Sequence, residues 1–300
     1  MRRKAVLLDR DRYCDEIVSQ AEGLARLLAG ADCSAPVPTC PGWTLADLAD
    51  HVTRNLRGLF DAVAGAEERR VRLRAGGGVV GAPVRPRRSG SDAERRASRA
   101  PSGAGAAARA MTAAATDVAA ALRHAGPNLR IRWCGLDGSS CTWARRGAHD
   151  LLIHRADAAL ALGVPCTASA DAGADALDEL LELLGGPPVP RPAERPEIEL
   201  RATDTGQSWS VTPDGRAFTW RRGPTRGAAA AVDDAAATEG RRAGAQQRTE
   251  AQRRGAGRAA LVGPLTALLL VTYRRADPRQ TTSFDDAELI DPWIAALALT

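Results

Sequence analysis

The side chains best suited to chemistry in this sequence are its four histidines, because histidine binds metal ions and transfers protons near neutral pH. His154 follows Asp150 by four residues in a segment with helical periodicity, so the two side chains share one helix face and can bind one ion together. Asp157 lies three residues further along that face, where a carboxylate can orient a ligand from behind. His149 is rotated by about 140° from His154, which predicts that it takes no part in this site.

His51 lies in an earlier segment with helical periodicity, three residues after Leu48 and close to an apolar stripe. This position is more often that of a histidine packed in a core. The spacing of Asp150 and His154 is likewise typical of a solvated contact on a helix surface. Spacing alone does not show that the two segments face each other, so a shared site depends on the fold.

The six cysteines do not indicate a metal site, because none of them forms a C-x-x-C pair. We expect reduced thiols in a cytoplasmic protein. The first residues contain too few apolar positions for a signal-peptide core, and the longest apolar stretch, 261–273, is too short to span a membrane.

Apolar periodicity predicts several helices and a short run of strands. Thr44 and Asp47 have the spacing of a capping box at the start of the second helix. The predicted helices cover 10–30, a stretch from Thr44 onwards, 111–122, 142–162, 173–184, 264–275 and 285–298. The predicted extended segments cover 129–133, 198–204, 208–213 and 216–220.

These elements predict a helical domain over 1–188 and, after a proline-rich linker, a small α+β domain over 189–300. Two segments, 66–110 and 226–258, lose periodicity and are rich in arginine, alanine and glycine. They are interpreted either as irregular or disordered surface loops or as compensated frame errors in a GC-rich gene.

The net charge of +5 comes entirely from the same two segments, which carry +7 and +3, whereas the rest of the chain carries −5. Basic chains often bind nucleic acid, but the arginine-rich stretches here have no interleaved aromatic residues and no recognition helix. Nucleic acid is therefore an unfavoured partner.

Two segments carry a resemblance to a known family. VPTCPGWTLADLADHV (37–52) resembles the P-x-W-x-x-x-D-L-x-x-H signature of the mycothiol-dependent maleylpyruvate isomerase family, and WARRGAHDLLIHRADAALALG (143–163) resembles its R-x-x-H-E-x-x-x-H-R-x-D-A signature. The resemblance implies α plus α+β architecture, namely a DinB-like four-helix bundle followed by a small sterol-carrier-like α+β domain. It also implies an actinobacterial source.

By position, the resemblance implies that His51, Asp150 and His154 are zinc ligands. The family has glutamate where this chain has Asp150, whose side chain is one methylene shorter. The family's substrate-contacting arginine falls in 66–110, where no residue aligns well enough to be named.

The resemblance further implies a zinc- and mycothiol-dependent enzyme whose fourth zinc position accepts the thiol. The thiolate would add to the cis double bond of a substrate such as maleylpyruvate, and rotation and elimination would give the trans isomer. The partners would be a low-molecular-weight thiol and a small electrophile. Two alternatives are a mycothiol S-transferase acting on other electrophiles and a non-catalytic metal-binding module.

Overall fold

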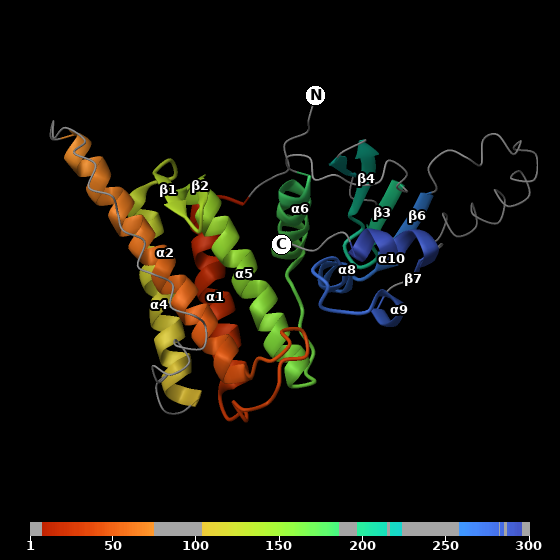
Figure 1. The fold of residues 1–300 in the computed structure, drawn as a ribbon, viewed down its shortest axis with the longest axis horizontal. Helices are drawn as coiled ribbons and strands as arrows, with labels where there is room; N and C mark the ends of the chain where they lie inside the picture. The colour runs from red at the N-terminus through yellow and green to blue at the C-terminus, as the bar shows by residue number, and fades with distance from the viewer. Residues whose placement is uncertain are drawn as a thin grey trace, which may run out of the picture. The chain divides into compact units, whose positions relative to one another are not determined.

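The computed structural model describes residues 8–74, 104–185, 197–214, 217–223, 258–281, 283–284 and 287–295. In these ranges no helix has both the length and the apolar character needed to cross a membrane. The chain forms two compact units that divide between Cys166 and Thr167 (Figure 1). The predicted class, a four-helix bundle followed by a small α+β domain, is confirmed.

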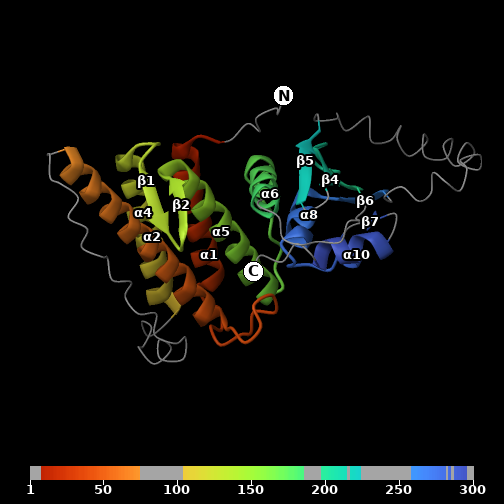
Figure 2. The same ribbon diagram turned by 45° about the horizontal axis from the view of Figure 1, so that its top comes forward.

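Four long helices form the described part of the N-terminal unit: α1 (Arg10–Leu28), α2 (Leu45–Arg74), α4 (Ala104–Ala125) and α5 (Ser140–Ala161). α1 and α2 each pack against both α4 and α5. Figures 1 and 2 show the first turns of α2 and the last turns of α5 at the same end of the bundle. The candidate ligands lie on these parts of the two helices, His51 on α2 and Asp150 and His154 on α5.

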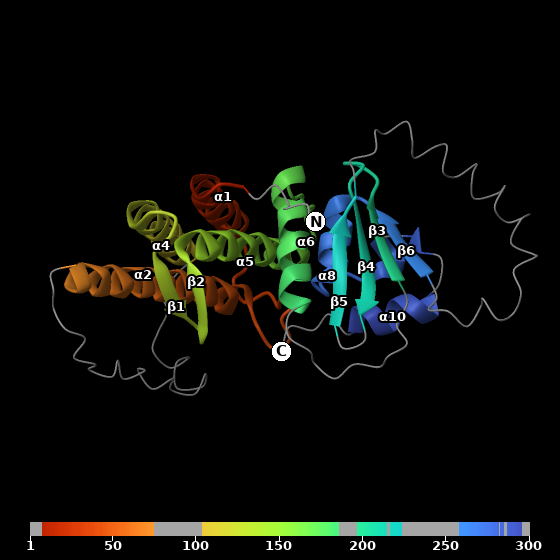
Figure 3. The same ribbon diagram turned by 90° about the horizontal axis from the view of Figure 1, so that it is seen from above.

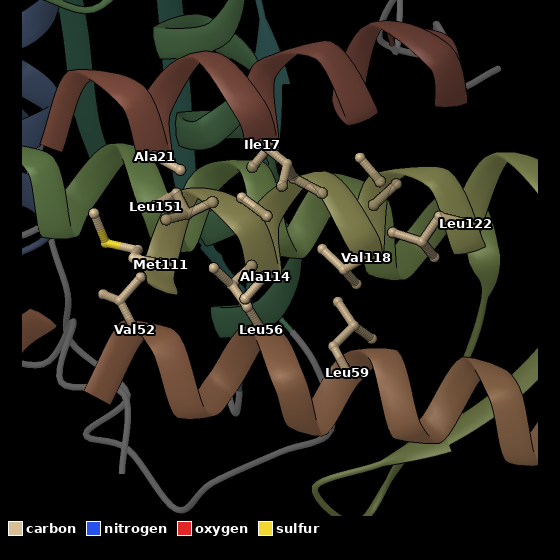
Figure 4. Close-up of a cluster of buried hydrophobic side chains, with 14 of the residues drawn as sticks. Ile17, Ala21, Val52, Leu56, Leu59, Met111, Ala114, Val118, Leu122 and Leu151 are labelled. Carbon is tan, nitrogen blue, oxygen red and sulfur yellow. The ribbon is translucent and has the colours of Figure 1, made fainter. Parts of the chain in front are cut away.

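Buried apolar side chains from all four helices form the core of the bundle. Figure 4 shows them pointing toward one another, with labelled examples at Ile17, Ala21, Val52, Leu56, Leu59, Met111, Ala114, Val118, Leu122 and Leu151. α1 and α5 approach closely at Gly147, where an added Cβ would lie 3.3 Å from Ile17 Cδ1. The core consists mainly of aliphatic and small residues, with Tyr13 and Trp143 as buried aromatic side chains.

Capping boxes fix the first turns of the two helices that carry candidate ligands. The Thr44 backbone N–H donates to Asp47 Oδ2 at 2.9 Å, and the Asp47 backbone N–H donates to Thr44 Oγ1 at 3.2 Å. Ser139 and Thr142 exchange equivalent bonds at the start of α5. The starting points of α2 and α5 are therefore determined by local sequence.

A hairpin formed by β1 (Arg130–Trp133) and β2 (Leu136–Ser139) connects α4 to α5 (Figure 3). Cys134 in its turn has a φ of 49°, as two-residue hairpin turns require. Trp143 Nε1 donates to the Ile131 carbonyl at 3.0 Å and tethers the hairpin to α5. The sequence predicts the first strand only, because β2 lacks an alternating apolar pattern.

The C-terminal unit combines a mixed sheet with short helices. Its elements are α6 (Ala170–Leu184), β3 (Glu197–Ala202), β4 (Ser208–Asp214), β5 (Ala217–Arg222), β6 (Arg258–Gly263), α8 (Leu265–Thr272), α9 (Pro278–Thr281), β7 (Ser283–Phe284) and α10 (Ala287–Ala295). The strand order is β5-β4-β3-β6-β7, and among these described strands only β3 and β6 pair in parallel (Figures 2 and 3). Paired residues such as Leu200 and Trp209 are fully buried and form its core.

α6 belongs to the C-terminal unit, so the division lies at 166/167 rather than at the expected residue 188. The Asp178 carboxylate of α6 accepts hydrogen bonds from Trp209 Nε1 at 2.6 Å and from Arg222 Nη1 at 3.2 Å. An added Cβ at Gly173 would lie 3.1 Å from Leu265 of α8, so these helices are in close contact. Periodicity shows that α6 has an apolar face but not which partner covers it.

The first segment without periodicity, 66–110, is helical at both ends, because α2 continues to Arg74 and α4 begins at Ala104. Residues 75–103 and 224–257 lie outside the described residues, together with the two interpretations offered for them. The helices at both ends of 66–110 are rich in alanine and arginine, which are good helix formers even without large apolar residues.

All six cysteines are free thiols, as the sequence predicts. Cys14 is fully buried, and burial raises the pKa of its thiol to about 11. Cys40 lies in the loop between α1 and α2 and reaches the candidate site.

Candidate functional site

The structure brings the three candidate ligands together at one end of the bundle. His51 lies in the second turn of α2 and His154 in the C-terminal half of α5. Their ring centroids are 5.1 Å apart with an interplanar angle of 79°, so the edge of one ring faces the other. Asp150, one turn before His154, places Oδ1 3.8 Å from His154 Nε2. The fold therefore supplies the convergence that spacing alone does not establish.

Asp157 orients the ring of His154 from a fully buried position. Asp157 Oδ2 lies 3.0 Å from His154 Nδ1. Thr39 Oγ1 donates to the other oxygen, Oδ1, at 2.6 Å, and Cys40 Sγ donates to Oδ2 at 3.7 Å. An ionised carboxylate only accepts hydrogen bonds, so Nδ1 of His154 donates in its contact with Asp157 and carries the ring proton. The other ring nitrogen, Nε2, is the one that lies near Asp150.

His51 is held between an aromatic ring and an amide. The Trp43 ring packs against it with a centroid distance of 4.8 Å, and Asn55 Nδ2 lies 3.0 Å from His51 Nε2. Burial, and then the nearby ring of His154, lowers the pKa of His51. His51 is therefore neutral at neutral pH, which is the form that binds a metal ion.

The other two histidines lie away from this cluster. His149 is buried on a different face of α5, where its ring meets the edge of Tyr13 of α1 at 6.1 Å. His124 is exposed in the last turn of α4. His149 and His154 therefore face different neighbours.

The donor types of the cluster fit a zinc ion, because two neutral imidazoles and a carboxylate are ligands that catalytic zinc sites use. Among the residues that the structure describes, however, no three or more His, Cys, Asp or Glu side chains form a group that could hold a metal ion. Ligation through His51 Nε2 requires the Asn55 amide to turn away, and Asp150 is 3.8 Å from His154. The ligand set of His51, Asp150 and His154 therefore stays a prediction.

A surface pocket of about 260 Å³ lies on another part of the bundle. It is lined by Arg57, Phe60 and Asp61 of α2 and by Asp117 and alanines of α4. None of the three candidate ligands is among its lining residues, so the pocket is distinct from the cluster.

Four contacts of the cluster come from residues that were not predicted to be site residues, namely Thr39, Cys40, Trp43 and Asn55. Asn55 follows His51 by four residues on the same helix face, so helical spacing could have identified it. The other three lie in a loop whose contacts with α2 and α5 depend on tertiary structure. Trp43 is the tryptophan of the family signature, so that signature could have identified it, whereas no spacing rule could have found Thr39 and Cys40.

The fold and the cluster define a class of protein, in which a four-helix bundle with histidine and aspartate side chains at one end precedes a small α+β unit. Residues 14–159 match the family model described as the mycothiol maleylpyruvate isomerase N-terminal domain. The match covers almost the whole N-terminal unit, so this unit is similar to that domain.

Two solved structures resemble this chain over 93% of its length and 93% of their own, at 12% sequence identity. One is the mycothiol-dependent maleylpyruvate isomerase, with a TM-score of 0.52. The other is a histidine-to-alanine mutant of the mycothiol-dependent maleylpyruvate isomerase, with a TM-score of 0.55. At this identity the likeness shows a shared fold. No curated protein sequence matches the chain.

Proposed function

We propose that this protein is a zinc- and mycothiol-dependent enzyme that isomerises the cis double bond of maleylpyruvate or a related small electrophile. The observation that carries the proposal is the convergence of His51 of α2 with Asp150 and His154 of α5. The family match supports mycothiol as the thiol. The six free cysteines agree with a reducing compartment such as the cytoplasm.

In this proposal His51, Asp150 and His154 hold the zinc ion and leave a position open to the thiol. A bound zinc ion would lower the pKa of the thiol, so that a thiolate is present near neutral pH. Neighbouring residues set the protonation of the two histidine ligands. Asp157 fixes the proton of His154 on Nδ1, and burial beside Trp43 keeps His51 neutral.

The proposal is tested by incubating the purified protein with zinc, mycothiol and maleylpyruvate. We expect fumarylpyruvate to form, and we expect its formation to stop when the thiol is omitted or when a chelator removes the metal. His154→Ala should lose the activity. His124→Ala is the matched control, because it removes an exposed histidine outside the cluster and should retain the activity.

Each alternative function gives a different result in the same assay. Attachment of mycothiol to an electrophile without isomerisation would indicate an S-transferase and contradict the proposed reaction. Zinc binding without any thiol-dependent turnover would indicate a non-catalytic metal-binding module. Turnover that persists fully in His154→Ala would contradict the assignment of the site.

A further inference from the structure

The loop between α1 and α2 is a folded segment rather than a loose connection. The Val37 backbone N–H donates to the Trp43 carbonyl at 2.8 Å, and the Trp43 N–H donates to the Cys40 carbonyl at 3.0 Å. Pro36 and Thr44 pair across its base. These contacts hold the backbone from which the side chains of Thr39, Cys40 and Trp43 project.

This loop contacts one histidine of the candidate site directly and is linked to the other through Asp157. Trp43 packs directly on the ring of His51. Thr39 reaches His154 indirectly, because its hydroxyl donates to Asp157 Oδ1 and the other oxygen of Asp157 contacts His154 Nδ1. One short loop thus sets the surroundings of two rings that come from different helices.

The hydroxyl of Thr39 controls how the Asp157 carboxylate can turn. Asp157 is fully buried, and its bond from Thr39 is short, at 2.6 Å. With Oδ1 held by Thr39, Oδ2 stays in place to accept from the ring of His154. Loss of the hydroxyl removes the restraint on Oδ1 and leaves the weaker donor Cys40 Sγ on Oδ2, so the carboxylate is held less firmly against Nδ1 of His154.

We propose that Thr39 is a positioning residue of this site, which acts through Asp157 to keep His154 in the tautomer that directs Nε2 toward Asp150 and His51. The role of this tautomer in binding a metal ion rests on the proposed function. The hydrogen-bond chain itself does not require a metal, so it can be tested in the metal-free protein.

The test compares the wild type with Thr39→Val, which keeps the shape but removes the hydroxyl, and with Thr39→Ser, which keeps the hydroxyl. Side-chain nitrogen NMR of metal-free protein reports which nitrogen of His154 carries the proton. We expect the Nδ1–H tautomer in the wild type and in Thr39→Ser, and a mixture of tautomers in Thr39→Val. Thr39→Ala replaces Thr39→Val if the latter does not fold.

Thr53→Val is the matched control, because Thr53 is a buried threonine of α2 whose hydroxyl donates to the Ala49 carbonyl at 2.7 Å. It removes a buried hydroxyl without touching Asp157 and should leave the tautomer unchanged. Zinc titration provides the second readout. Thr39→Val should bind zinc about tenfold more weakly than the wild type, and Thr39→Ser should restore the affinity.

An Nε2–H tautomer of His154 in the wild type would overturn the inference, and so would identical tautomers in the wild type and Thr39→Val. A wild-type protein that binds no zinc would contradict the proposed function instead. The tautomer measurement would still decide the role of Thr39, so the two failures are distinguishable.

Discussion

Asp150 has the shortest side chain among the three proposed ligands. The length of this side chain limits how near its carboxylate can come to the two histidine rings. Its Oδ1 atom lies 3.8 Å from His154 Nε2, at the long limit of a direct contact. The family signature that this segment resembles has glutamate here, which reaches one methylene further.

We therefore expect Asp150→Glu to bind zinc severalfold more tightly than the wild type and Asp150→Ala to bind it more weakly. Zinc titration in competition with a chromogenic chelator measures both changes. Asp50, a partly exposed residue of α2 paired with Arg54, provides the control variant Asp50→Glu, which should leave zinc affinity unchanged. Equal zinc affinities in wild type, Asp150→Glu and Asp150→Ala would show that Asp150 is not a ligand.

His51 makes the stability of the metal-free protein depend on pH. Burial lowers its pKa in the folded state below the value of 6.5 that it regains on unfolding. Below about pH 6.5 the unfolded chain therefore binds this proton more readily, and stability falls as the pH decreases.

His51→Gln should reduce this loss of stability on acidification, because glutamine does not titrate. Urea unfolding of the metal-free proteins at about pH 7 and about pH 5 measures the difference. The wild type should lose more free energy of unfolding between these two pH values than His51→Gln. The opposite order would show that His51 does not have the lowered pKa.

At the scale of elements, the helices of the bundle were predictable from sequence because their buried residues recur at helical spacing. The segment from Cys14 to Leu24 and the segment from Leu45 to Leu59 are clear examples. β6 and β7 were not predicted, because β6 adjoins a segment without pattern and β7 is very short. Their pairing with distant strands, rather than local periodicity, defines them.

The capping box of α2 predicts a local stability effect. Thr44→Ala removes the acceptor for the Asp47 backbone N–H and should lower the free energy of unfolding by about 1 kcal/mol. Thr116→Ala, at an exposed position in the middle of α4, is the control and should not lower it. Urea unfolding of both variants gives the comparison, and equal losses would argue against a specific role for the cap.

At the scale of the whole molecule, the sequence indicated two units but placed α6 in the wrong one. The assignment depends on long-range contacts such as the bond from Trp209 to Asp178, which no local pattern reveals. The same reasoning applies to the candidate site. The His and Asp residues were identified from motif and spacing, whereas Thr39 and Cys40 reach the site only through tertiary folding.

Asp178→Ala tests the assignment of α6 to the C-terminal unit. It removes the buried carboxylate between Trp209 and Arg222 and should destabilise that unit by about 3 kcal/mol or more. Hydrogen exchange of the full chain should become faster in α6, β3 and β4 while α1 and α5 remain protected. Glu182→Ala, at an exposed position of the same helix, is the control. Equal acceleration in both units would contradict the division.

The central claim is that His51, Asp150 and His154 form a zinc site, and metal content tests it most directly. Elemental analysis of the protein after equilibration with zinc and removal of excess metal should show stoichiometric zinc in the wild type and in His124→Ala. It should show loss of the metal in His154→Ala. A wild type that retains no zinc, or a His154→Ala variant that retains it fully, would contradict the account.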